Sequence, residues 1–306
     1  MPRLVECIPN FSEGRDRAVI DALSLAAQKV PGVTLLDVQA DEGHNRSVLT
    51  LVGSPEGMEE AAVALAKAAA ALIDLRRHSG EHPRMGAVDV IPFVPVMDVT
   101  MEDCVELSRR AARRVWEEAH IPVFLYEESA SAAHRVNLAD VRRGQFEGMP
   151  AKLKLAEWAP DFGGREIHPT AGVVAVGARK PLVAFNVNLD TDNVEVAKEI
   201  AKVVRASSGG FRGIKALGLL PVPGGRAQVS MNVVDYEAAP LYRAVEVIRM
   251  EAARWGARVM GTELVGLTPA KALIDSAAYY LQLEGLDSRR QVLEYHLIGS
   301  GGGKHE

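Results

Sequence analysis

The sequence predicts an α/β fold of the α+β type, built from two similar halves. Its 306 residues exceed what one hydrophobic core usually serves, because single cores stop growing at about 250–300 residues. Hydrophobic residues make up 48% and charged residues 25% of the chain, which is typical of a globular protein. The same order of strand-like and helix-like apolar patterns recurs in both halves, and this repeat carries the prediction.

The first half begins with the element order β-α-β-β-α-β. Short apolar runs predict strands, and apolar residues at helical spacing predict helices. In chain order we expect a strand at 4–9, a helix at 15–29, strands at 33–38 and 47–52, a helix at 55–76 and a strand at 88–94. An amphipathic helix at 101–119 and a strand at 122–126 follow, and residues 129–172 are expected to be irregular.

The same order returns 178 residues later, where Leu182-Val183 aligns with Leu4-Val5. The expected elements are a strand at 182–187, a helix at 194–206, strands at 214–220 and 227–234, a helix at 240–255 and a strand at 258–265. Two such ferredoxin-like units, each with a sheet under two helices, could face one another and form a cleft. We expect subdomains at 1–178 and 179–298 and a flexible, Gly-rich tail at 299–306. Two coincidental α/β runs are the alternative.

Charge and cysteine content exclude several classes of function. Lys and Arg number 35 against 40 Asp and Glu, so the net charge of −5 provides no overall attraction to nucleic acid or to an anionic membrane. Cys7 and Cys104 are too few for a disulfide framework and favour a reducing compartment. The N-terminus lacks an apolar signal core, and charges interrupt the Ala-rich stretch 61–75. We therefore expect a cytoplasmic protein.

The densest group of reactive residues is His78-Ser79-Gly80-Glu81-His82-Pro83-Arg84-Met85-Gly86-Ala87. The pattern H-x-x-E-H at 78–82 matches an inverted zinc-protease motif. That motif needs an uninterrupted helix, which Gly80 and Pro83 disfavour. A loop histidine beside Glu81 and Arg84 can take up and return a proton near neutral pH. The pattern favours His82 as a general acid/base without a metal; a histidine that only stabilises the turn is the alternative.

A second polar group lies at 41–46, between two expected strands. Arg46 at the start of the second strand could bind a carboxylate through its planar guanidinium, because two N–H groups match two carboxylate oxygens. An ordinary solvated hairpin loop is the alternative.

Several blocks of sequence, taken in order, resemble the glutamate formimidoyltransferase family, which is also the formiminotransferase part of formiminotransferase-cyclodeaminases. They run from Leu4-Val5-Glu6-Cys7-Ile8-Pro9-Asn10-Phe11-Ser12-Glu13-Gly14 through Gly80-Glu81-His82-Pro83-Arg84-Met85-Gly86-Ala87-Val88-Asp89-Val90, Trp158-Ala159-Pro160-Asp161-Phe162-Gly163 and Gly177-Ala178-Arg179-Lys180 to Ala184-Phe185-Asn186-Val187-Asn188-Leu189. The resemblance extends to Leu264-Val265-Gly266-Leu267 and so covers nearly the whole chain.

The resemblance implies transfer of the formimino group from N-formimino-L-glutamate to N5 of tetrahydrofolate or its polyglutamates. This is a one-carbon step in histidine breakdown, carried out by a homodimer with tetrahydrofolate as co-substrate and no metal. The cyclodeaminase activity is expected to be absent. Two alternatives stay open: a formyltransferase that uses N-formylglutamate, and a folate-binding protein without catalysis.

The resemblance also assigns residues. The catalytic histidine of the family falls on His82. Because the implied substrates carry several carboxylates, and not because the family assigns these positions, Arg46, Arg84 and Arg179 are expected to hold them. The folate-contacting segment falls on Gly163, Gly164, Arg165, Glu166, Ile167, His168, Pro169, Thr170, Ala171 and Gly172, with Trp158 and Phe162 expected nearby.

One departure from the family concerns an acid partner for the histidine. Animal enzymes carry an acid where this chain has Gln39. If an acid is needed, Asp37, Asp41 or Glu81 would have to replace it.

Overall fold

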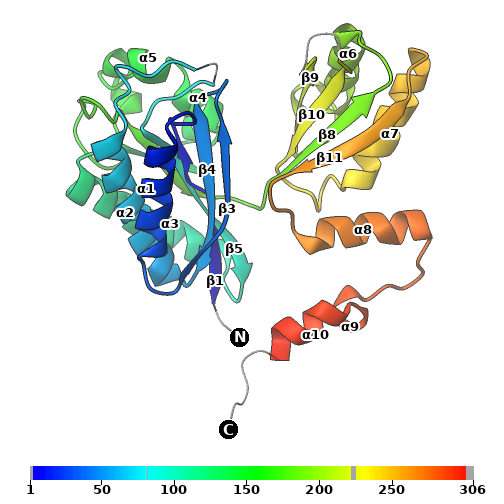
Figure 1. Cartoon of the computed structure of the whole chain (residues 1–306), viewed down its shortest axis with the longest axis horizontal. Helices are drawn as coiled ribbons and strands as arrows, with labels where there is room; N and C mark the ends of the chain where they lie inside the picture. The colour runs from blue at the N-terminus through cyan, green and yellow to red at the C-terminus, as the bar shows by residue number, and fades with distance from the viewer. Residues whose placement is uncertain (1–2, 81, 222–224, 301–306) are drawn as a thin grey trace. The chain divides into compact units, whose positions relative to one another are not determined.

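The computed structural model describes residues 3–80, 82–221 and 225–300, and the chain divides into two compact units, Met1–Arg179 and Lys180–Glu306. Each unit has its own buried core and its own sheet, and Figure 1 shows the two sheets. The β-α-β-β-α-β order predicted for each half is found in each unit, except that two short strands, Leu4–Cys7 and Asn10–Phe11, take the place of the single strand expected at 4–9.

The first unit is built on a seven-stranded sheet. Strands β1 and β2 follow one another along one line of the sheet, because each pairs with both β4 and β5. β3 extends the sheet beyond β4, while β7 and then β6 continue it in parallel beyond β5. The bounds are β1 Leu4–Cys7, β2 Asn10–Phe11, β3 Val33–Asp41, β4 Arg46–Gly53, β5 Val88–Met97, β6 Val123–Glu127 and β7 Val174–Ala178.

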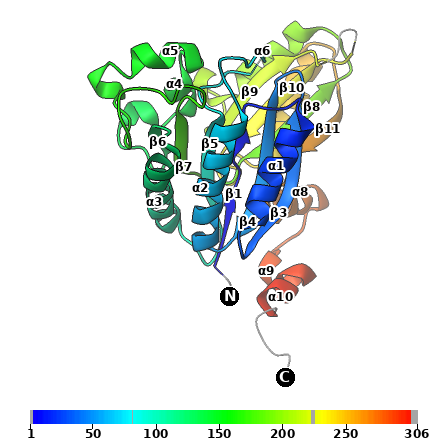
Figure 2. The same ribbon diagram turned by 60° about the vertical axis from the view of Figure 1, so that its left-hand side comes forward.

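Three long helices cover one face of this sheet, α1 (Arg17–Gln28), α2 (Pro55–Leu72) and α3 (Met101–Ala119) (Figure 2). Local sequence sets their starts. The Asp16 carboxylate caps α1, Ser54 precedes a proline that suits the first turn of α2, and Thr100 and Asp103 form a capping box at α3. The α3 bounds match the prediction, whereas α2 ends four residues before the predicted Arg76.

A second layer, which the sequence did not predict, packs on the other face. Residues 129–172, expected to be irregular, contain α4 (Leu138–Arg142), α5 (Gln145–Lys152) and the 3₁₀ turns Ala133–Arg135 and Ala156–Trp158. Val141 of α4 and Met149 of α5 pack with Val90, Phe124 and Ala175 from β5, β6 and β7. The helices are too short to show a readable apolar period, and the apolar run of β7 was not assigned.

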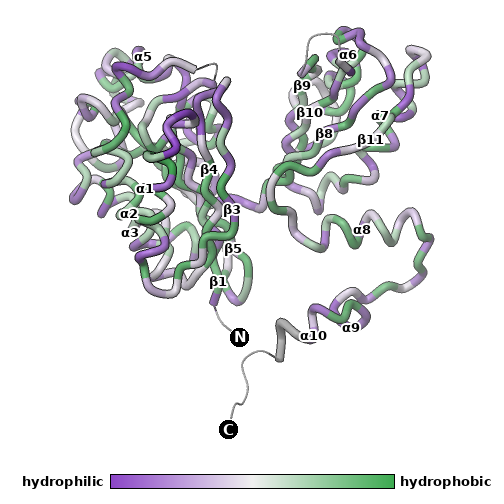
Figure 3. Tube along the Cα trace, in the orientation of Figure 1, coloured by the Kyte–Doolittle hydropathy of each residue, from purple (hydrophilic) through white to green (hydrophobic). Residues whose placement is uncertain are grey.

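The second unit is a four-stranded antiparallel sheet in the order β11-β8-β10-β9. Its core packs apolar side chains of α6 and α7 against the strands, in which hydrophobic and polar residues are interspersed (Figure 3). The bounds are β8 Val183–Leu189, α6 Val194–Val204, β9 Ile214–Leu219, β10 Gln228–Val233, α7 Leu241–Arg254 and β11 Val259–Val265.

Three further helices follow β11: α8 (Ala270–Leu281), α9 (Ser288–Gln291) and α10 (Leu293–Ser300). Of the expected tail 299–306, the first two residues end α10 and the others lie outside the described residues. None of the helices in the described ranges is both long enough and apolar enough to cross a membrane.

Candidate active site

A buried carboxylate, that of Asp89 in β5, lies at the centre of the site. Its side chain is 0% exposed, and Oδ1 accepts a 2.8 Å hydrogen bond from the Met85 backbone N–H. Oδ2 lies 2.7 Å from Nη2 of Arg142 and 3.2 Å from Nη1 of Arg46. Burial alone would raise the pKa of Asp89, but the charges of Arg142 and Arg46 outweigh it and hold this pKa below its usual value. Asp89 is therefore an anion that ties β4 and α4 to β5.

Arg46, the first residue of β4, links this carboxylate to His82. Its Nε and Nη2 donate to Oδ1 of Asn10 at 3.1 and 2.7 Å, and its Nη1 lies 2.9 Å from Nδ1 of His82. The Asn10 amide in turn donates to the Ile8 carbonyl. The planar guanidinium of Arg46 is therefore held by Asn10 on one side and by Asp89 on the other, which fixes its positive charge beside the imidazole.

His82 lies on the loop between α2 and β5, partly exposed. Nδ1 lies 2.7 Å from the Pro83 carbonyl oxygen, which can only accept, and 2.9 Å from Nη1 of Arg46, which can only donate. With its proton on Nδ1, directed at Pro83, the neutral ring keeps a lone pair on Nε2, and Arg46 acts on it through its charge. Nε2, for which the described residues provide no partner, is the nitrogen left for a substrate. Burial, followed by the charges of Arg46 and Arg142, lowers the pKa of His82 to about 4. The ring is therefore neutral at physiological pH and can accept a proton.

The segment that the resemblance assigned to folate runs beside the His82 loop. The Ala87 N–H donates to the Ala171 carbonyl at 2.9 Å, and the Val173 N–H donates to the Met85 carbonyl at 3.0 Å. Gly172 has a φ of +69°, and a Cβ there would collide with the Met85 carbonyl, so only glycine permits this close approach. Tertiary pairing thus brings together two segments that lie far apart in the sequence.

Within the segment 163–172, exposure changes from one end to the other. Gly163 through Glu166 are exposed, whereas Ala171 and Gly172 are buried. Nδ1 of His168 accepts hydrogen bonds from the backbone N–H groups of Thr170 and Ala171, which tightens the buried end. The exposed end is therefore the part that a ligand can reach.

The other predicted carboxylate clamps are placed differently from Arg46. Arg84 is buried, and its fork pairs with both oxygens of Glu147, at 2.9 and 2.6 Å, while its Nε donates to Nδ1 of His78. Arg179 follows β7 level with Val94, roughly 16 Å along β5 from Asp89 at the usual rise of a strand. Both substrate-binding roles stay predictions.

The zinc alternative does not fit the local structure. The described residues of 78–84 are not helical, and Nε2 of His78 lies 3.0 Å from the Asn45 carbonyl while its Nδ1 accepts from Arg84. Across the described part of the chain, no three His, Cys, Asp or Glu side chains gather closely enough to hold a metal ion.

The three acids that could partner His82 in place of Gln39 either bind other side chains or lie outside the described residues. Asp37 accepts a 2.9 Å hydrogen bond from Gln39, and Asp41 pairs with His44 at 2.9 Å. Glu81 lies outside the described residues.

Sequence reasoning missed Asn10, Asp89 and Arg142. Asp89 had a readable signal, because a single acid inside the apolar run Ala-Val-Asp-Val-Ile-Pro-Phe-Val must be paired when the strand is buried. Arg142 had none, since it stands in a stretch expected to be irregular and reaches Asp89 only through the fold.

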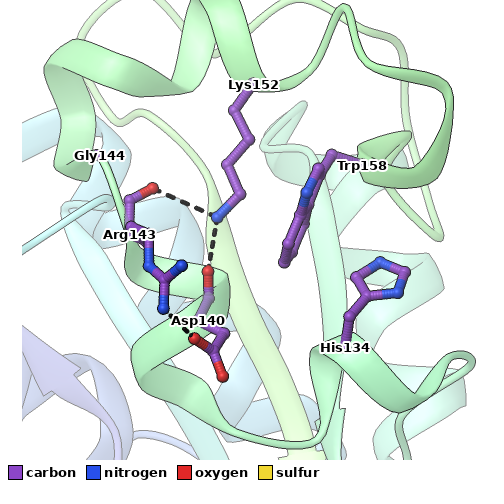
Figure 4. Close-up of a pocket in the computed structure, with 6 residues that line it drawn as sticks. All are labelled: His134, Asp140, Arg143, Gly144, Lys152 and Trp158. Carbon is purple, nitrogen blue, oxygen red and sulfur yellow. Dashed lines mark hydrogen bonds and ion pairs between the residues drawn. The ribbon is translucent and has the colours of Figure 1, made fainter.

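A separate pocket of about 390 Å³ lies beside α4 and α5, lined by His134, Asp140, Arg143, Gly144, Lys152 and Trp158 (Figure 4). Nζ of Lys152 donates to the carbonyls of Asp140 and Val141 and lies 3.7 Å from the centre of the Trp158 ring. Burial lowers the pKa of Lys152 to about 8. The Lys152 ammonium is therefore already held by the carbonyls of α4.

Comparison with known proteins agrees with the sequence resemblance. Residues 4–179 match the formiminotransferase domain, N-terminal subdomain, and residues 184–297 match the formiminotransferase domain. Glutamate formimidoyltransferase from Streptococcus pyogenes serotype M1 is 58% identical over 98% of this chain and 100% of its own length.

Two further relatives extend the comparison. The Thermoplasma acidophilum glutamate formimidoyltransferase is 48% identical over 93% of this chain and 94% of its own length. The formimidoyltransferase-cyclodeaminase of Rattus norvegicus is 45% identical over 94% of this chain, which corresponds to 54% of the rat protein. The chain belongs to the formiminotransferase family.

Proposed function

We propose that this chain is a glutamate formimidoyltransferase, which transfers the formimino group from N-formimino-L-glutamate to N5 of tetrahydrofolate or its polyglutamates and releases glutamate. The observation that carries the proposal is a neutral imidazole, that of His82, with Nε2 left for substrate and a cationic group behind it. Relatives that match nearly the whole chain bear this name.

His82 acts first as a base and then as an acid. N5 attacks the formimino carbon: the new C–N bond forms as the π pair of the C=N bond moves onto the imino nitrogen, and the N5 proton passes to Nε2 of His82. The tetrahedral intermediate then loses glutamate: the pair on the imino nitrogen re-forms the C=N bond, the bond from the carbon to the glutamate nitrogen breaks, and Nε2 returns the proton to that nitrogen. The Pro83 carbonyl, 2.7 Å from Nδ1, supports the imidazolium in between. The His82 ring is then neutral again, as it was before the reaction.

The surrounding charges suit an anionic substrate. Arg46 and Arg142 carry two positive charges and Asp89 one negative charge, so the group has a net charge of +1 in a chain whose overall charge is −5. A carboxylate of the donor or of the folate glutamate is attracted to this local charge, chiefly at Arg46.

Folate is proposed to contact the segment 163–172. Its exposed end leads directly into the buried end, whose backbone pairs with the loop that carries His82. On the resemblance alone, we also propose a cytoplasmic homodimer that acts in histidine breakdown and binds neither nucleic acid nor membranes.

The function is tested by incubating the purified protein with tetrahydrofolate and either N-formimino-L-glutamate or N-formylglutamate, and measuring the folate product and free glutamate. We expect turnover with the formimino donor. Turnover with the formyl donor alone would correct the substrate, and folate binding without any product would identify a binding protein.

Folinic acid is expected to slow amide hydrogen exchange in peptides that cover 163–172, most strongly at the exposed end. Ligand contact orders a glycine-rich stretch and shields its N–H groups. Peptides from α6 serve as the internal control. Equal exchange in 163–172 with and without folinic acid would remove this segment from the folate site.

Arg46→Lys is expected to raise KM for N-formimino-L-glutamate by about 10- to 100-fold, because Lys loses the fork and hydrogen bonds to charged groups are worth about 1.5–3 kcal/mol. Arg76→Lys, at an exposed arginine paired with Asp74, is the matched control and should leave KM unchanged. A rise confined to the KM for folate would show that Arg46 serves the other substrate.

A further inference from the structure

The second arginine on Asp89 comes from a part of the chain to which neither the sequence nor the family comparison assigns a role. Arg142 ends α4, and its side chain is only 14% exposed. Its Nη2 lies 2.7 Å from Asp89 Oδ2, and its buried Nε has no hydrogen-bond partner among the residues that the structure describes. Burying a guanidinium is costly, so the position must supply something that a neutral side chain would not.

Arg142 and Arg46 share one carboxylate oxygen, and Arg46 in turn touches Nδ1 of His82. The chain of contacts therefore runs from α4 through β5 and β4 to the catalytic loop. Without Arg142, Asp89 could pair with Arg46 alone, and that pair would be neutral. With Arg142 present, one positive charge is left over behind the imidazole.

The charged groups that face His82 come from each element packed around it. β4 contributes Arg46, β5 contributes Asp89, and α4 contributes Arg142. The turn between β3 and β4 contributes His44, whose ring lies edge-on with its centre 6.3 Å from the centre of the His82 ring, and which is itself paired with Asp41. Asp89 is the attractive charge for an imidazolium, and both arginines oppose it.

We propose that Arg142 is a positioning residue for His82: through the Asp89 carboxylate oxygen that the two arginines share, it fixes Arg46 against the imidazole and leaves one uncompensated positive charge behind that ring. The consequence for catalysis rests on the proposed function, in which His82 must be a base to take the N5 proton. The imidazolium formed in the first step is then a strong acid, which favours return of the proton to the leaving nitrogen. The effect on His82 itself does not depend on any substrate.

Arg143 provides a matched control one residue along the chain. It carries the same charge, but it is 79% exposed, pairs with Asp140 and lines the pocket of Figure 4. Arg143→Met thus removes an equal charge from nearly the same position without touching Asp89. Arg142→Lys keeps the charge and loses only the planar fork.

The experiment is an NMR titration of full-length protein labelled with ¹⁵N-histidine, without substrate, in which His82→Gln identifies the His82 signal. In the unmodified chain the His82 midpoint is expected near 4. Arg142→Met should raise it by about one pH unit or more, whereas Arg143→Met should leave it unchanged and Arg142→Lys should keep it low. Thermal unfolding checks that each variant is folded.

Each outcome decides the proposal. A midpoint near the ordinary 6.5 in the unmodified chain would overturn it without any variant, even if Arg142→Met failed to fold. Equal shifts in Arg142→Met and Arg143→Met would show a general charge effect and overturn it as well. In Arg142→Met, the pH at which kcat/KM falls to half on the acid side should rise together with the His82 midpoint. That result supports the role of Arg142 in catalysis. If no variant transfers formimino groups, the proposed function fails while the titration still decides the role of Arg142.

Discussion

His82→Ala is expected to lower kcat by about 10²- to 10⁴-fold, the usual contribution of a placed proton-transfer group. The methyl side chain cannot take the N5 proton or return it to glutamate. Folate affinity should change little, because the segment 163–172 is held by backbone pairing with Met85 and Ala87, which the substitution leaves in place. Steady-state formimino transfer, folate titration and thermal unfolding on one preparation measure all three quantities.

His78→Ala is the control, since it lies on the same loop but its ring nitrogens contact Arg84 and Asn45. We expect a loss of less than about tenfold, caused by looser placement of the loop. Near-normal turnover in a folded His82→Ala protein would refute the acid/base assignment. Equal loss in both variants, together with inhibition by a chelator, would revive the zinc alternative.

Asp89→Ala is expected to lower the free energy of unfolding of the first unit by about 3–5 kcal/mol. Removing a buried ion-pair partner leaves its counter-charges uncompensated, and here two guanidinium groups, those of Arg46 and Arg142, lose their shared carboxylate. Urea unfolding can be followed by the fluorescence of Trp116 and Trp158, which both lie in the first unit. A Trp255→Phe substitution removes the tryptophan signal of the second unit.

Glu60→Ala is the comparison for Asp89→Ala. Glu60 also binds an arginine, Arg114, through two contacts at 2.6 and 3.1 Å, but its side chain is 57% exposed. Its loss should cost less than about 1 kcal/mol, because water solvates the remaining charge. If the two substitutions cost the same, Asp89 is not the buried anchor described above.

The fold and part of the site could be predicted from sequence because their signals are local. Helix α3 was predicted with its observed bounds from its long amphipathic period, and the Thr100–Asp103 capping box that the structure shows at its start is likewise formed by neighbouring residues. The same holds for the β-α-β-β-α-β order and for a loop at His82, where Gly80 and Pro83 disfavour a helix.

By itself, then, the sequence determined the repeated β-α-β-β-α-β pattern, the family and the placement of His82 on a loop. Only the tertiary structure decided that α4 and α5 form a layer, that 170–173 pairs with the His82 loop, and that Arg142 meets Asp89. All three features depend on contacts between residues that are far apart in the chain but close in space, through backbone hydrogen bonds or buried ion pairs. A local periodicity carries no information about such partners, and helices as short as α4 have too few residues to show one.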